Sequence, residues 1–114
     1  NNDNKYSLMN KKGKKMTYQI PTPTTHPGLI LQETIIVPYG LTQAKLADLL
    51  NVGINTINEI IKQKRSITPS MALKLSKLFD TTPQFWLHFQ NGYDLYRTYE
   101  DEKESLDSIT PFSG

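Results

Sequence analysis

From His26 onward, apolar residues recur every three or four positions in short blocks that end at prolines, glycines or polar turns. This spacing is typical of amphipathic helices, because the apolar residues of a half-buried strand alternate instead. We expect five helices in the 114 residues, and they begin at Pro27, at Gln43, near Gly53, at Pro69 and at Pro83. The first should stop before Pro38, since proline lacks the backbone donor, and the last should reach about Lys103. The sequence therefore predicts an all-α five-helix bundle in a single domain.

The two ends of the chain lack the helical spacing and differ in charge. We divide the chain into a flexible N-terminal extension (1–25), a helical domain (26–104) and a C-terminal tail (105–114). The net charge is only +2, but the first 15 residues are basic through Lys5, Lys11, Lys12, Lys14 and Lys15, whereas residues 100–107 are mainly acidic. Two interpretations stay open: both ends are solvated tails, or the basic arm contacts phosphates while the acidic end points away from them.

Several function classes lack their residues in this sequence. There is no cysteine, which excludes disulfides and thiolate metal sites, and the two histidines, His26 and His88, form no cluster with metal-ligand spacing. No apolar run approaches the roughly 18–20 residues of a membrane span, and no signal peptide is visible. No nucleophile and base are spaced as in a catalytic site. We therefore expect a cytoplasmic protein that is not an enzyme, does not enter a membrane, and uses no metal or cofactor.

The second and third predicted helices have the residues that a helix-turn-helix requires. Ala47 is small enough to let the following helix cross closely, Val52 places the turn against the core, and Ile57 fills the angle from the other side. Two short helices that meet steeply across a tight turn need this packing. We therefore predict a DNA-binding helix-turn-helix whose recognition helix begins near Gly53.

The free face of this helix carries side chains suited to base edges. Asparagine can form two hydrogen bonds with adenine, and threonine can donate a hydrogen bond or contact a thymine methyl group. Thr42 and Gln43 should bind a phosphate at the start of the preceding helix, and the basic residues after the recognition helix should bind others. The predicted DNA-binding residues are Thr42, Gln43, Gly53, Ile54, Asn55, Thr56, Asn58, Glu59, Lys62, Lys64 and Arg65. Glu59 fits least well, because it could accept from cytosine but would repel phosphate; the alternative for the whole face is an ordinary solvated helix surface.

The last predicted helix is rich in aromatic residues. They form either the core or a two-fold dimer interface, and we assign to that interface Phe85, Trp86, Phe89, Tyr93 and Tyr96. Trp86 taken alone fits the core better. A dimer suits DNA binding, because two recognition helices about 34 Å apart can read a palindrome. His26 precedes a proline and is expected only to cap the first helix.

Several stretches resemble a known family. Leu41-Thr42-Gln43-Ala44-Lys45-Leu46-Ala47, Ile57-Asn58-Glu59-Ile60 and Lys64-Arg65-Ser66-Ile67-Thr68-Pro69 resemble the phage-repressor-like (XRE, lambda repressor-like) helix-turn-helix. His26-Pro27-Gly28, Thr82-Pro83-Gln84-Phe85-Trp86-Leu87, Gln90 and Tyr93-Asp94-Leu95 are similar to the HigA, or virulence-associated protein I, family. The resemblance covers residues 26–97, and the more specific motifs are those at its two ends.

The resemblance implies a dimeric antitoxin of a type II toxin–antitoxin system. Such a protein neutralises a HigB-like, RelE-like toxin that cleaves mRNA, and it represses its own operon by binding double-stranded operator DNA. By position, the resemblance implies the DNA-facing residues Gln43, Gly53, Asn55, Thr56, Asn58 and Glu59, although Glu59 stands where some family members carry a basic residue. Two alternatives remain: a free-standing XRE-family repressor without a toxin partner, and an interaction scaffold that has lost DNA binding.

Overall fold

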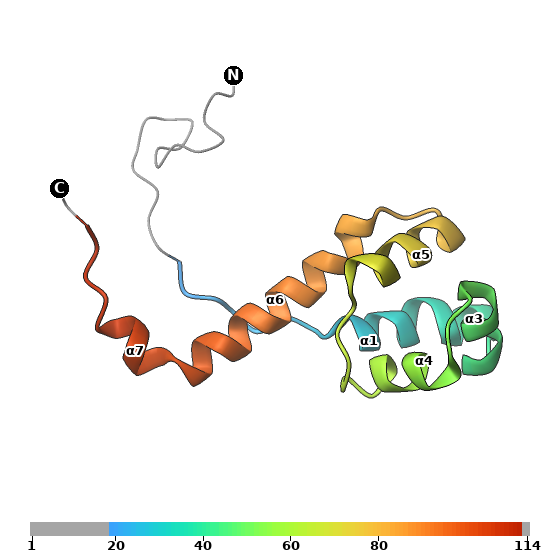
Figure 1. Cartoon of the computed structure of the whole chain (residues 1–114), viewed down its shortest axis with the longest axis horizontal. Coiled ribbons are helices and arrows are strands. Elements are labelled where there is room, and N and C mark those ends of the chain that lie inside the picture. The colour runs from blue at the N-terminus through green and yellow to red at the C-terminus, as the bar shows by residue number, and fades with distance from the viewer. Residues whose placement is uncertain (1–18, 113–114) are drawn as a thin grey trace, which may run out of the picture.

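The structure, a computed structural model, describes residues 19–112, and every regular element in that range is a helix (Figure 1). In chain order these elements are α1 (Pro27–Leu31), the π-helix η2 (Gln32–Ile36), α2 (Val37–Tyr39), α3 (Gln43–Leu50), α4 (Ile54–Ile61), α5 (Pro69–Phe79), α6 (Pro83–Asp101) and α7 (Lys103–Asp107). The first three follow one another without a break and make one continuous helix. The all-α prediction is confirmed, and the short α7 is an element that the sequence did not predict.

The first helix passes through Pro38 instead of stopping before it, so that expectation was wrong. In an α-helix, the proline ring clashes with the carbonyl group four residues earlier. Here the preceding turn is wider, because the backbone N–H of Val37 donates to the carbonyl of Gln32, five residues back. The π turn accommodates Pro38 within a continuous helix. The helix then ends at Gly40, whose φ of 63° lies in the left-handed region.

Three threonines cap the helices that begin, as predicted, at Gln43, Pro69 and Pro83. The hydroxyl oxygens of Thr42, Thr68 and Thr82 each accept the backbone N–H three residues later, at 3.0–3.2 Å. Such N-caps satisfy a donor that the helix itself leaves free and contribute about 1 kcal/mol each. Pro69 and Pro83 occupy the first helical positions after two of these caps, where a missing N–H costs nothing.

His26 begins α1, and Gly28 brings this helix against α4. The imidazole Nδ1 of His26 accepts the backbone N–H of Gly28 at 2.9 Å, which confirms the expected cap. A Cβ atom at Gly28 would lie 1.9 Å from the carbonyl oxygen of Ile60. Only glycine therefore permits this approach of α1 to the recognition helix.

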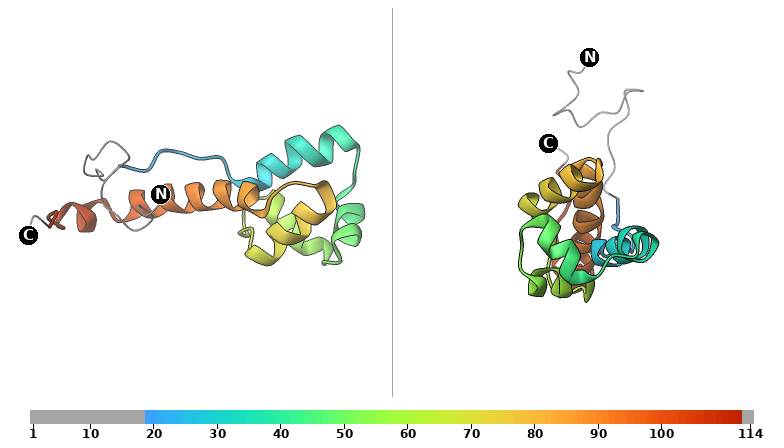
Figure 2. Two further views of the ribbon diagram at one scale, coloured as in Figure 1. Left: turned by 90° about the horizontal axis from the view of Figure 1, so that it is seen from above. Right: turned by 90° about the vertical axis from the view of Figure 1, so that its right-hand side faces the viewer.

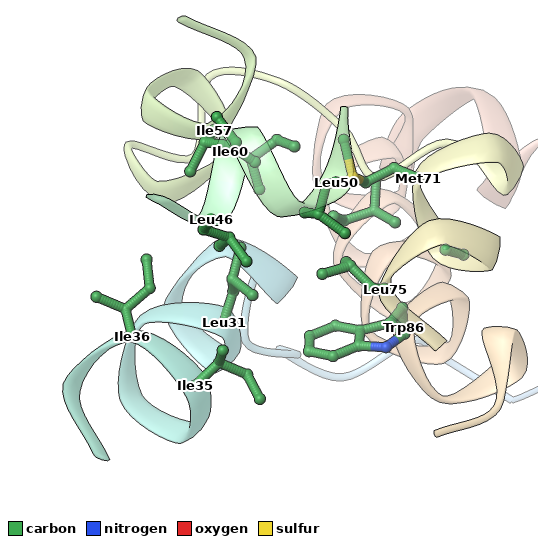
Figure 3. Close-up of a cluster of buried hydrophobic side chains, with 13 residues drawn as sticks. Leu31, Ile35, Ile36, Leu46, Leu50, Ile57, Ile60, Met71, Leu75 and Trp86 are labelled. Atoms are coloured by element: carbon green, nitrogen blue, oxygen red, sulfur yellow. The ribbon is translucent and has the colours of Figure 1, made fainter. Parts of the chain in front are cut away.

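The core lies where this first helix, α3, α4, α5 and the start of α6 meet (Figure 3). Its buried hydrophobic members are Leu31, Ile35, Ile36, Leu46, Ala47, Leu50, Ile57, Ile60, Ile67, Met71, Ala72, Leu75 and Trp86. Trp86 is only 1% exposed, and its indole Nε1–H donates to the hydroxyl of Thr81 at 2.9 Å. The assignment of Trp86 to a dimer interface was therefore wrong, because its own chain already buries it completely.

α6 extends beyond the helical body on which it packs, and α7 follows at its far end (Figure 2). The extended segment 19–25 runs beside it in both views. A Cβ at Gly92 would lie 2.7 Å from the hydroxyl oxygen of Thr24, so this segment contacts α6 closely there. The predicted flexible extension thus includes residues that lie along α6, while its residues 1–18, with the five lysines, fall outside the described range.

Candidate nucleic-acid interface

α3 and α4 form the helix-turn-helix that the sequence predicts. Ala47 and Ile57 are buried between the two helices, and the half-buried Val52 packs against the same core. Asn51 ends α3 in the left-handed conformation, with φ of 57°, and the N–H of Val52 donates to the carbonyl of Ala47 at 3.0 Å. These local contacts reverse the chain within a few residues, and α4 begins directly after Gly53.

The recognition helix α4 presents one face to the core and the other to solvent. Ile57 and Ile60 are buried, whereas Asn55 is exposed, Thr56 is half-buried and Ile54 is 50% exposed. Gly53 is exposed, and a Cβ there would meet nothing within 4 Å. The predicted outward orientation is confirmed. That these residues contact bases stays a prediction.

A hydrogen bond joins the start of α3 to the middle of α4. The side-chain Nδ2 of Asn58 donates to Oε1 of Gln43 at 3.1 Å. This bond uses one of the two N–H groups of Asn58 and leaves its second N–H and its Oδ1 unused. The Nε2 group of Gln43 takes no part in this bond. Two predicted DNA-binding residues from separate helices therefore fix each other's position.

Two predicted DNA-binding residues of opposite charge, Glu59 and Arg65, form an ion pair with each other. Arg65 Nη2 lies 2.6 Å from Oε1 of Glu59, and Arg65 Nε donates to the same oxygen at 2.8 Å. Both side chains are about half exposed, at 50% and 44% respectively. Glu59 therefore binds a cation of its own chain, which sequence reasoning did not predict.

The loop after α4 is fixed at both of its ends. At its start, Gln63 adopts φ of 63°, and the N–H of Lys64 donates to the carbonyl of Glu59 at 2.8 Å. At its end, the N–H of Ile67 donates to Oε1 of the buried Gln90 at 2.7 Å. This loop holds Lys62, Lys64 and Arg65 exposed beside the recognition helix.

Gln90 is the residue of this region whose structural role sequence reasoning missed. It is 4% exposed, and its Nε2 donates to Oδ1 of Asp94 at 3.0 Å. Through these bonds α6 supports the loop that carries the predicted phosphate contacts. A signal was available, because an amide four residues after Trp86 falls on the buried stripe of the same helix.

The structure divides the predicted dimer interface between two sides of α6. Phe85, Phe89 and Tyr96 lie on one face together with Gly92, at spacings of four, three and four residues. Phe85 is 40% exposed and packs edge-on against Phe89, with 5.3 Å between ring centroids. Tyr93 instead packs against the ring of His26, at 4.7 Å between centroids. The interface assignment itself stays a prediction for the partly exposed residues.

Residues 19–112 contain neither a cluster of metal ligands nor a membrane-spanning helix. No group of three or more potential metal ligands lies together there. In the same range, no helix combines the length and the apolar character that a membrane crossing requires.

Known proteins resemble this chain over most of its length. A family profile described as Helix-turn-helix matches residues 33–86. Virulence-associated protein I of Dichelobacter nodosus is 42% identical over 91 residues, which are 80% of this chain and 83% of the relative. Antitoxin HigA-1 of Vibrio cholerae is 31% identical over 84 residues, 74% of this chain and 79% of the relative. A structure described as Pseudomonas aeruginosa antitoxin HigA with higBA promoter is similar at a TM-score of 0.75 and 33% identity, over 78% of this chain and 98% of that one.

Proposed function

The chain belongs to the HigA and virulence-associated protein I family of helix-turn-helix proteins, and from this premise we propose that it is an antitoxin that represses its own operon. The family consists of DNA-binding antitoxins and regulators, not of enzymes. The proposed partners are double-stranded operator DNA, a HigB-like toxin and a second copy of the chain. It acts in the cytoplasm, where a RelE-like toxin would cleave mRNA.

The observation that carries the DNA-binding half of this proposal is the accessible polar face of α4. Buried Ile57 and Ile60 fix the helix, and Asn55 is exposed on the opposite side. A short helix backed by a rigid core and polar on its outer face can enter the major groove of DNA. The relative solved with promoter DNA supports this function for the same fold.

The mechanism assigns different contacts to base edges and to phosphates. Asn55, Thr56 and Asn58 read bases, while Ile54 contacts a thymine methyl group. Thr42 uses its hydroxyl oxygen as the cap of α3 and keeps its own O–H as a donor to a phosphate. Lys62 and Lys64 add phosphate contacts from the end of α4 and the following loop. The base contacts give specificity, and the phosphate contacts give register and most of the affinity.

The toxin-binding half rests on the family name of the relatives. An antitoxin holds its toxin in an inactive complex, and we propose that a surface other than the α4 face covers the toxin's catalytic residues or prevents its access to the ribosome. Separate surfaces would allow one molecule to bind toxin and operator at once.

The DNA-binding half is tested by titrating the protein against a labelled duplex of the DNA upstream of its own gene. We expect specific binding whose affinity falls steeply as salt rises, because each phosphate contact releases counterions. An unrelated duplex of equal length serves as the control. Equal affinity for both duplexes would contradict operator recognition.

Removing the side chain of Asn55 should affect DNA binding differently from removing that of Lys62. We predict that Asn55→Ala weakens operator binding by about 1–3 kcal/mol, because a base contact is lost. The ratio of its affinities for the operator and for unrelated DNA should therefore fall. Lys62→Ala should weaken binding to both duplexes by the same factor. It should also lower the slope of log affinity against log salt by about one, because one phosphate contact is lost. The measurement is fluorescence anisotropy on both duplexes at several salt concentrations. An equal loss on both duplexes for Asn55→Ala would contradict its assigned role.

The toxin-binding half is tested by co-expression with the small reading frame beside its gene. We expect the neighbouring product to stop growth when expressed alone, growth to recover when both are expressed, and the two proteins to purify together. Operator binding without rescue or co-purification would instead favour a free-standing repressor.

A further inference from the structure

Glu59 is the one member of the DNA-facing surface whose charge opposes the proposed function. Its carboxylate lies on the recognition helix, and Arg65 lies in the loop that follows it. Two nitrogens of the guanidinium, Nε and Nη2, bind the single oxygen Oε1 of Glu59 at 2.8 and 2.6 Å. This contact uses one edge of the guanidinium and leaves Nη1 for another acceptor.

The backbone brings these two residues together independently of their charge. The N–H of Lys64 donates to the carbonyl of Glu59 at 2.8 Å, which turns the chain back over the end of α4. The N–H of Ile67 is bound by buried Gln90 at 2.7 Å, which fixes the far end of the loop. Between these two anchors the long Arg65 side chain has many rotamers, and the carboxylate of Glu59 selects one of them.

We propose that Glu59 is a positioning residue that holds Arg65 in place to bind a DNA phosphate. The proposal rests on the operator binding proposed above and assigns Glu59 no base of its own. An arginine fixed before it binds loses less side-chain entropy when it meets a phosphate, and the pair retains hydrogen-bond donors that match phosphate oxygens. The acidic residue therefore increases affinity for an acidic ligand.

Three roles for Glu59 give three different outcomes when Glu59→Ala is measured with and without Arg65. If Glu59 only repels phosphate, Glu59→Ala strengthens DNA binding. If Glu59 reads a cytosine, the variant weakens binding by the same factor whether or not Arg65 is present. If Glu59 positions Arg65, the variant weakens binding only while Arg65 is present.

The experiment is a double-mutant cycle on the full chain, with the labelled upstream duplex as the probe. We expect Glu59→Ala to weaken binding about two- to fivefold, the scale of one half-exposed ion pair, and Arg65→Ala to weaken it further. The double variant should bind as Arg65→Ala does. Glu59→Gln, which keeps an oxygen acceptor for the guanidinium, should recover part of the loss.

Asp48→Ala is the matched control for charge. Asp48 is an exposed carboxylate on α3, and it forms no ion pair with any residue in the range 19–112. We expect Asp48→Ala to leave binding unchanged or to strengthen it slightly. Unchanged or stronger binding by Glu59→Ala, or an undiminished effect in the Arg65→Ala background, would overturn the proposal.

Side-chain NMR of the free protein separates this proposal from the proposed function. We expect the Nε–Hε group of Arg65 to be ordered in the unmodified protein and mobile in Glu59→Ala. Equal order in both proteins would overturn the positioning role. If the unmodified protein shows no preference for the upstream duplex, operator recognition fails and this inference falls with it; if it shows that preference and Glu59→Ala binds as well, the inference alone fails.

Discussion

His26 is a buried imidazole whose hydrogen bond requires the neutral ring. Its Nδ1 accepts the N–H of Gly28 at 2.9 Å, and a protonated Nδ1 could not accept it. Burial lowers the pKa of His26 below its ordinary value of 6.5, and the positive charge of Arg97 lowers it further, while Asp94 acts in the opposite direction. Tyr93 packs edge-on against the same ring.

The depressed pKa of His26 predicts a pH dependence of stability. The unfolded chain takes up a proton near pH 6.5, whereas the folded chain takes it up only at lower pH. The contribution of His26 is therefore fully present above about pH 6.5 and declines as the pH falls from there through the folded-state pKa. Urea unfolding between pH 7.5 and 5.5 measures this decline.

Two histidine variants assign the decline to its source. His26→Asn keeps a side-chain oxygen that can cap α1 but removes the titrating group, so its free energy of unfolding should change less over this pH range. His88→Asn replaces the exposed histidine and should retain the full decline. If both variants behave alike, the decline does not come from His26.

At the scale of the helix, the sequence predicted those features that depend only on neighbouring residues, such as where a helix begins. Thr68-Pro69 and Thr82-Pro83 place a cap and a first-position proline side by side, and both helices begin there as expected. The π turn before Pro38 could not be predicted in this way. A helix can continue through a proline when the packing of the residues around it favours a continuous helix. Ile35 and Ile36, in the turn before Pro38, are both buried.

The approach of α1 to α4 predicts different costs for the same substitution at two glycines. Gly28→Ser would place Cβ 1.9 Å from the backbone carbonyl of Ile60, so the two helices would have to move apart. We expect the free energy of unfolding to fall by about 1–3 kcal/mol, as for other overpacked cores. Gly53→Ser is the control, because its Cβ would meet nothing within 4 Å and serine is a good N-cap. Equal urea midpoints for the two variants would contradict the close contact at Gly28.

At the scale of the whole molecule, the sequence could predict which face of α4 is exposed. It could not predict the hydrogen bonds between residues that lie far apart in the chain. Helical spacing alone placed Ile57 inward and Asn55 outward. The bond from Asn58 to Gln43 spans 15 residues, and the bond from Ile67 to Gln90 spans 23. Such contacts depend on how α3, α4 and α6 pack, which a local pattern does not specify. For the same reason the sequence could not decide which aromatic residues of α6 face the core.

The length of α6 bears on how two copies would bind a palindrome. Its distal half extends beyond the helical body (Figure 2), and Tyr96 shares a face there with Phe85 and Phe89. Part of this face is already occupied, because Thr24 packs against Gly92. A second copy would meet the remaining aromatic surface, and two-fold pairing through it would join two recognition helices rigidly.

This arrangement predicts opposite results for one new positive charge on the two sides of α6. Tyr96→Lys places a lysine in the proposed interface, and we expect the dimer measured by sedimentation to dissociate at least tenfold more readily. Asn91→Lys adds the same charge to an exposed position on another side of the helix, away from the loop of Lys64 and Arg65, and should leave the dimer intact. Because both variants gain one charge, nonspecific attraction to DNA is matched. Only Tyr96→Lys should then lose the preference for an operator with two half-sites over one with a single half-site. If Tyr96→Lys keeps both its dimer and that preference, the copies pair through another surface, and the interface prediction for α6 is wrong.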